Sequence, residues 1–91
     1  MTAMKTETVT MTIREYLNEC VDTFGNDMPS SVMYYFNGDT DGYEIEDFEI
    51  TDSKLVLEGD LSFSLDIVGN VVDGVLQFDS KGDTIGIEFW F

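Results

Sequence analysis

Eight acidic residues crowd the middle of this chain, and their carboxylates are the groups best suited to chemistry. They are Asp39, Asp41, Glu44, Glu46, Asp47, Glu49, Glu58 and Asp60. Ionised carboxylates pair with Lys and Arg side chains and also bind hard cations. The chain of 91 residues has 19 acidic residues, four basic residues and a formal charge of −15. Such a charge attracts basic surfaces and repels nucleic acid and anionic membranes.

The residues that enzymes most often use near neutral pH are missing. There is no histidine, and hence no imidazole base, metal ligand or Ser-His pair. Cys20 falls on the apolar stripe of a predicted helix, so we expect a small buried hydrophobe. Two carboxylates can support glycoside hydrolysis, but nothing distinguishes one pair among the nineteen. We therefore expect no enzyme activity and no cofactor, and no direct binding of nucleic acid, since four cations do not offset phosphate repulsion.

The loop Asn37–Gly42 resembles the first half of an EF-hand calcium loop, with oxygen donors at loop positions 1, 3 and 5 and glycine at position 6. The residue at loop position 12 is Phe48 where a bidentate Glu is required, and the flanking segments are patterned as strands. An oxygen-rich set that could hold a cation weakly remains, namely Asp39, Asp41, Glu44 and Asp47. Turns are rich in Asp and Gly for conformational reasons too, so we assign no metal ligand.

One amphipathic helix is the first element that positions these groups. Thr12 and Glu15 fit a capping box at its start, and Gly25 followed by Pro29 ends it. Apolar residues recur between them at helical spacing, at Ile13, Tyr16, Leu17, Cys20, Val21 and Phe24. The pattern predicts a helix over about 13–24. The Thr-rich residues 1–11 are expected to form a loose N-terminal arm, and residues 12–91 a single domain.

Apolar and polar residues alternate after Pro29, which predicts strands. Val32–Phe36 is a short aromatic strand, and Tyr43–Thr51 alternates with a slip that suggests a bulge near Asp47. Residues 54–68 alternate throughout, so they form either one long bent strand or two strands with a turn at Gly59-Asp60.

Two further turns are predicted near the C-terminus. Gly69-Asn70 is a hairpin signal, from which Val71–Phe78 returns. Residues 80–83 turn again, and Thr84–Phe91 is the last strand. These elements predict an α+β fold in which the helix packs on a curved antiparallel sheet of about five strands in meander order.

Strand alternation is expected to place many carboxylates on the sheet face away from the helix. These are Glu44, Glu46, Glu58, Asp60, Asp66, Asp73 and Glu88. Residues two apart on a strand are separated by about 6.5–7 Å, which is near the spacing of backbone phosphates along a nucleic-acid strand. The face could therefore resemble a phosphate ladder.

The C-terminal strand offers a second kind of contact. Phe89 and Phe91 are expected in the core, whereas Trp90 points to the acidic face, where it is either an interface anchor or covered by the N-terminal arm. If this last strand lies at an open edge, it could pair with the same strand of a second copy and form a homodimer.

The predicted function is inhibition, in which the chain docks on a basic, nucleic-acid-binding protein and occludes its nucleic-acid site. In size, charge and scarcity of cysteine the chain is similar to phage- and plasmid-encoded inhibitors of restriction and CRISPR effectors, a likeness of class without a shared motif. An immunity protein that neutralises a toxin is an alternative, as is a structural domain whose acidic surface only keeps it soluble. The predicted partner-binding residues are the eight acidic residues above and Trp90.

The single cysteine and the lack of an apolar leader predict a cytoplasmic protein that does not engage a membrane.

Overall fold

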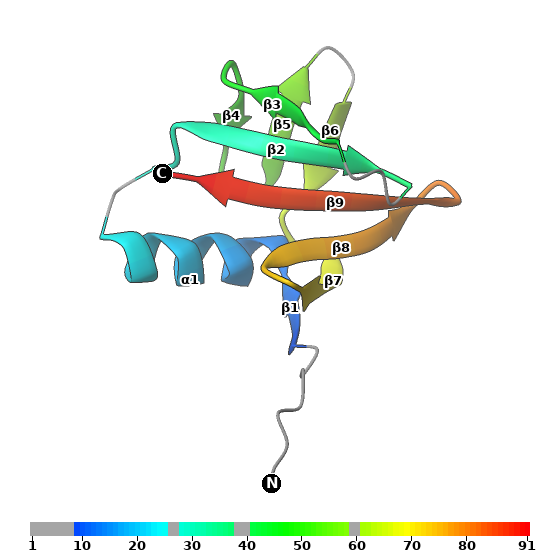
Figure 1. Cartoon of the computed structure of the whole chain (residues 1–91), viewed down its shortest axis with the longest axis horizontal. Coiled ribbons are helices and arrows are strands. Elements are labelled where there is room, and N and C mark those ends of the chain that lie inside the picture. Colours follow the sequence, from blue (N-terminus) through cyan, green and yellow to red (C-terminus); the bar gives the residue numbers. More distant parts are fainter. Residues whose placement is uncertain (1–8, 26–27, 38–40, 59–60) are drawn as a thin grey trace, which may run out of the picture.

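The computed structural model describes residues 9–25, 28–37, 41–58 and 61–91, which form one helix and nine strands (Figure 1). The elements are β1 (Val9–Thr12), α1 (Ile13–Phe24), β2 (Ser31–Phe36), β3 (Tyr43–Ile45), β4 (Glu49–Ile50), β5 (Lys54–Glu58), β6 (Leu61–Ser64), β7 (Val68–Val72), β8 (Val75–Ser80) and β9 (Asp83–Trp90). The predicted α+β class is confirmed. The meander of about five strands is wrong, because these strands form two sheets.

Helix α1 begins and ends where the sequence predicts. The Thr12 hydroxyl accepts a hydrogen bond from the Glu15 amide at 3.1 Å, and the Glu15 carboxylate accepts one from the Thr12 amide at 2.9 Å. This capping box satisfies two amides that the helix itself leaves unpaired. Gly25 ends the helix in the left-handed conformation with φ of 70°. The buried face of the helix consists of Ile13, Tyr16 and Leu17.

The larger sheet has the strand order β1-β7-β8-β9-β2-β3, and all of its pairs are antiparallel. Strand β9 lies inside this sheet between β8 and β2. The open edge that pairing with a second copy through this strand would need is therefore not met, because β8 and β2 pair with β9 on its two sides. Its alternation is confirmed, since Ile85, Ile87 and Phe89 are buried while Trp90 is 44% exposed.

The smaller sheet, β4-β5-β6, packs with α1 on one face of the larger sheet. Phe63 of β6 meets Phe78 of β8 edge to face, with ring centroids 5.1 Å apart, and Tyr16 of α1 lies 5.5 Å from Phe89. All of these side chains belong to one hydrophobic core. We call the face of the larger sheet that looks away from this core the outer face. In Figure 1 the smaller sheet lies behind β2 and β9, with the outer face toward the viewer.

The hairpin predicted at Gly69-Asn70 is misplaced, because both residues lie inside β7. The chain turns instead at Asp73-Gly74, both with positive φ (54° and 83°), as a tight hairpin requires. Gly69 has a different role, since a Cβ there would come within 2.5 Å of the Gln77 carbonyl oxygen of β8. Here glycine permits close strand packing.

The long alternating stretches are interrupted where the chain changes sheet. Residues 46–48 connect β3 of the larger sheet to β4 of the smaller one, so the bulge expected near Asp47 is a crossing between sheets. Residues 54–64 follow the second predicted alternative and form the pair β5–β6. Gly59 and Asp60, between these two strands in the sequence, lie outside the described residues. The amides of Ile13 and Arg14 donate to the carbonyls of Ile67 and Leu65 at 3.0 Å, which ties the β6–β7 crossing to α1.

Ordered pairing begins earlier than the sequence suggested. Val9–Thr12 form β1 and pair with Val68–Val71 of β7 at one edge of the larger sheet. Residues 1–8 lie outside the described part of the chain, so the division into an arm and a domain stays a prediction.

Candidate functional site

Six of the eight acidic residues proposed as binding groups lie in the described part of the chain, and every one of them is exposed to solvent. They are Asp41, Glu44, Glu46, Asp47, Glu49 and Glu58. Asp39 and Asp60 lie outside the described residues. The predicted surface position of the six is therefore confirmed, whereas their role in binding stays a prediction.

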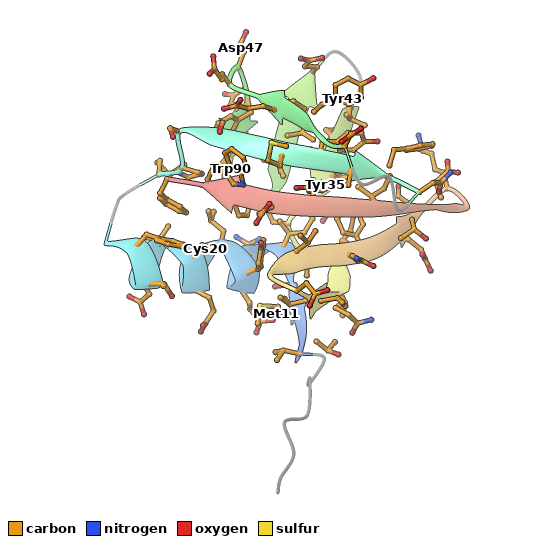
Figure 2. All side chains as sticks on the ribbon, in the orientation of Figure 1. Met11, Cys20, Tyr35, Tyr43, Asp47 and Trp90 are labelled. Carbon is orange, nitrogen blue, oxygen red and sulfur yellow. The ribbon has the colours of Figure 1, made fainter. Side chains whose placement is uncertain are left out.

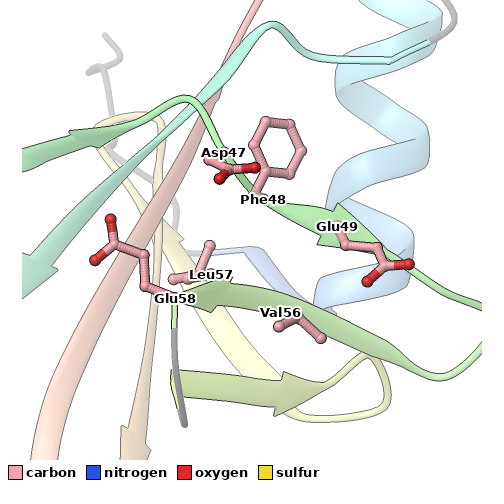
Figure 3. A pocket seen from close by; sticks show the side chains of 6 residues that line it. All are labelled: Asp47, Phe48, Glu49, Val56, Leu57 and Glu58. Atoms are coloured by element: carbon pink, nitrogen blue, oxygen red, sulfur yellow. The ribbon is translucent and has the colours of Figure 1, made fainter.

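Four of these residues gather where β3, β4 and β5 meet, and we call them the acidic corner: Glu46, Asp47, Glu49 and Glu58. An open pocket of about 410 Å³ lies among them, lined by Asp47, Phe48, Glu49, Val56, Leu57 and Glu58. Figure 3 shows the carboxylates of Asp47, Glu49 and Glu58 around this pocket. Leu57 is buried and Phe48 packs against the core, so they form an apolar floor.

Local sequence explains how the acidic corner forms. The crossing at 46–48 brings β3 and β4 together, and Phe48 anchors it by packing on the core. Glu49 then pairs with Val56 across β4–β5, and Glu58 ends β5. Alternation turns Leu55 and Leu57 inward, which leaves Glu58 at the surface.

Within the described ranges no ion pair joins the acidic corner to a basic side chain. One ion pair is present in these ranges, between Arg14 and Asp66, with the Nη2 and Oδ1 atoms 3.2 Å apart. Arg14 also donates to the Asp52 carbonyl at 3.1 Å, so its guanidinium is held near the β6–β7 crossing. The carboxylates of the acidic corner are therefore available to an external cation.

The predicted single-faced ladder of carboxylates is wrong. Glu44 and Glu88 lie opposite the same residue of β2, Met33, and so share the outer face of the larger sheet. Glu58 belongs to the smaller sheet, and Asp66 and Asp73 lie in turns. The division into two sheets, which the alternation alone does not reveal, separates these charges.

A second open cavity, of about 250 Å³, adjoins the acidic corner between the two sheets. It is lined by Tyr34, Tyr43, Glu44, Ile45, Glu58 and Leu61. Tyr43 is 72% exposed, and Glu58 borders both cavities. This end of the molecule thus combines carboxylates with exposed aromatic surface.

The described residues include no group of three or more Cys, Asp or Glu side chains that could hold a metal ion. Asp39, the central donor of the EF-hand-like loop, lies outside them. The thiol of Cys20 is half-buried beside Tyr16, and burial raises its pKa. A raised pKa disfavours the thiolate that a nucleophile needs. The burial expected for Cys20 is only partial, because the residue also lines an open pocket, and its structural role stays a prediction.

Sequence reasoning placed Trp90 and Glu88 on one face but missed Tyr35 as a partner of Glu88. Glu88 precedes Trp90 by two residues, and its carboxylate accepts a hydrogen bond from the Tyr35 hydroxyl at 3.1 Å. Tyr35 comes from β2, 53 positions away. Alternation in β2 indicates which face Tyr35 occupies. It does not predict the β2–β9 register that brings Tyr35 to Glu88.

Within the described parts of the chain, no helix is long and apolar enough to cross a membrane. Comparisons with protein-family models, with curated proteins and with solved structures found no match. The functional argument therefore rests on the geometry and charge of this chain.

Proposed function

We propose that this protein binds a basic, nucleic-acid-binding protein through its acidic corner and thereby occludes the nucleic-acid site of that partner. The observation that carries the proposal is the group of exposed carboxylates around an open pocket, in a chain with a formal charge of −15. Asp39, Asp41, Glu44 and Asp60, close in sequence, belong to the proposed surface.

Electrostatics would supply the recognition. A partner that binds nucleic acid presents a groove of Lys and Arg side chains, and a strongly acidic protein is steered toward it faster than a neutral one. The acidic corner lies at strand ends and on the segment that crosses between the two sheets (Figure 3). An inhibitor of this kind, such as an anti-restriction or anti-CRISPR protein of a phage or plasmid, needs no catalytic group.

The test is capture followed by competition. The tagged protein is incubated with nuclease-treated lysate of the native host at low and moderate salt, and retained proteins are identified by mass spectrometry. Each purified candidate is then assayed for DNA or RNA binding with and without this protein. We expect a basic protein that loses nucleic-acid binding, with an effect that weakens as salt rises.

The decisive comparison uses two variants of equal charge. D47K/E49K/E58K reverses three carboxylates of the acidic corner, and E19K/D22K/D52K reverses three exposed carboxylates elsewhere. Loss of inhibition in the first and its retention in the second would support the proposal. Equal inhibition by both, or the absence of any captured nucleic-acid-binding protein at low salt, would favour a surface that only keeps the chain soluble.

A further inference from the structure

The outer face of the larger sheet carries a second, differently built carboxylate. Along β9 the side chains of Glu88 and Trp90 point to this face, and across the β2–β9 pair Glu88 lies opposite Met33 and Trp90 opposite Ser31. Trp90 is 44% exposed, while Glu88 is only half-exposed. No described helix or strand covers them, and Figure 2 shows Trp90 and Tyr35 on the side of the sheet facing the viewer.

Two glycines, Gly42 and Gly86, leave the room that the Tyr35 side chain occupies. A Cβ on Gly42 would come within 2.8 Å of the Tyr35 Cε2 atom, and a Cβ on Gly86 within 3.2 Å of its Cβ atom. Both distances are shorter than ordinary van der Waals contacts, so the ring occupies the space that side chains at these positions would need. The ring position in turn aims the hydroxyl at Glu88.

The Tyr35 hydroxyl, which approaches from the Gly86 side, donates to the Glu88 Oε1 atom at 3.1 Å and so fixes the direction of a carboxylate two residues from Trp90 on the same face. One hydroxyl leaves most of the acceptor capacity of a carboxylate unused. Within the described residues no Lys or Arg forms an ion pair with Glu88. Glu44, across Met33 on β3, adds negative potential to the same face.

An oriented carboxylate beside an exposed indole matches one chemical class of ligand. Arginine stacks its planar guanidinium on aromatic rings and presents N–H donors that carboxylates accept in pairs. A second copy of the chain fits less well, because each copy carries a formal charge of −15 and like charges would face one another.

We propose that Trp90 and Glu88 form a binding site for an arginine side chain of a basic partner. Tyr35 is the positioning residue for Glu88, and Met33 lies beside the aliphatic stem of the bound arginine. This inference goes beyond the proposed function, because it assigns a separate surface on the larger sheet. It does not require that the partner bind nucleic acid.

The only tryptophan of the chain lies in this site and reports on it directly. Trp90 emission is recorded while the intact protein is titrated with a hexa-arginine peptide at low salt. We expect a saturable change in emission, and a weaker affinity for hexa-lysine, because an ammonium does not stack on the ring as a guanidinium does. Emission that stays constant while calorimetry detects binding would overturn the proposal.

Matched variants separate this site from general attraction. Glu88→Gln should weaken hexa-arginine binding about fivefold. Asp22→Asn, the same charge change on exposed α1, should weaken it by less than about twofold. Equal losses in the two would overturn the proposal. A thermal melt of each variant verifies that the fold is retained.

The positioning role of Tyr35 has its own readout. Tyr35→Phe removes the hydroxyl and keeps the ring, so it should weaken binding in the wild-type chain and have no further effect in the Glu88→Gln chain. Additive losses would show that Tyr35 does not act through Glu88. Trp90 emission is also recorded while D47K/E49K/E58K is titrated with hexa-arginine. A saturable change there shows that this site works even if the acidic corner does not bind its partner.

Discussion

The acidic corner and the outer face use carboxylates in opposite ways. At the corner Glu46, Asp47, Glu49 and Glu58 are exposed, and their side chains have no hydrogen bond to another described residue. On the outer face one carboxylate, Glu88, is half-buried and held by Tyr35. The corner thus concentrates charge without fixing its direction, whereas the outer face fixes the direction of one charge.

Charge and geometry affect different steps of association. Many solvated charges raise the rate of encounter with a basic partner, and their effect falls as salt increases. An oriented carboxylate beside an aromatic ring acts at contact distance, so it affects the dissociation rate and the choice between Arg and Lys. If both proposals hold, loss of the corner slows association and loss of Glu88 speeds dissociation.

The largest expected effect breaks the acidic corner. D47K/E49K/E58K should lower the association rate constant for hexa-arginine about tenfold or more at low salt, because it removes three negative charges from one place and adds three positive ones. Stopped-flow mixing that follows Trp90 emission measures this constant. The scattered reversal E19K/D22K/D52K should lower it by only about threefold. Equal rate constants in the two variants would mean that net charge alone matters.

The next largest effect is expected from a substitution at Gly42, which contacts the Tyr35 ring of the outer face. Gly42→Ala places a methyl group within 2.8 Å of the Tyr35 ring, and we expect a loss of about 1–3 kcal/mol in the free energy of unfolding. Urea unfolding followed by far-UV circular dichroism measures it. In a Tyr35→Ala background the same substitution should cost little, because the ring is gone. A cost that persists there would place the strain elsewhere in the loop.

A third prediction contrasts a buried tyrosine, Tyr16, with an exposed one, Tyr43. Tyr16 is 5% exposed and donates to the Gly74 carbonyl at 2.6 Å, and burial raises the pKa of its hydroxyl. The folded state therefore holds this proton more tightly than the unfolded chain does. Its contribution to stability is complete below the unfolded tyrosine pKa of about 10 and is lost as pH rises above that value.

Between about pH 10 and pH 11 this loss should be about 1 kcal/mol for a single tyrosine. Tyr16→Phe should flatten that part of the stability curve, although it lowers stability at neutral pH by removing the bond to Gly74. Tyr43→Phe, at a position that is 72% exposed, is the matched control. Denaturant unfolding across this pH range distinguishes the two variants.

Whether a feature of the fold or of the candidate sites can be predicted from the sequence depends on how far apart in the chain the interacting residues are. The helix could be predicted because Thr12, Glu15 and Gly25 specify its ends through bonds within a few residues. The exposure of the acidic corner could be predicted because a carboxylate rarely leaves water without a partner. Both are local properties of the chain.

Pairing between distant strands could not be predicted in the same way. Gly69-Asn70 and Asp73-Gly74 carry similar turn signals, and the choice between them depends on how closely β7 approaches β8 at Gln77. The Tyr35–Glu88 bond likewise depends on a register between β2 and β9 that only the folded sheet fixes. Alternation assigns a residue to a face but does not name its neighbour.

The smallest expected effect concerns stability and the uneven spread of charge. Raising salt from about 10 to 200 mM shortens the range of repulsion, and with a formal charge of −15 it should raise the free energy of unfolding by about 0.5–1 kcal/mol. Both triple variants lower the net charge equally, but only D47K/E49K/E58K removes repulsion where carboxylates are crowded. Its salt response, measured by thermal melting, should therefore be smaller than that of E19K/D22K/D52K. Identical responses would show that repulsion is spread over the whole surface, in which case the crowding of the acidic corner carries no cost in stability.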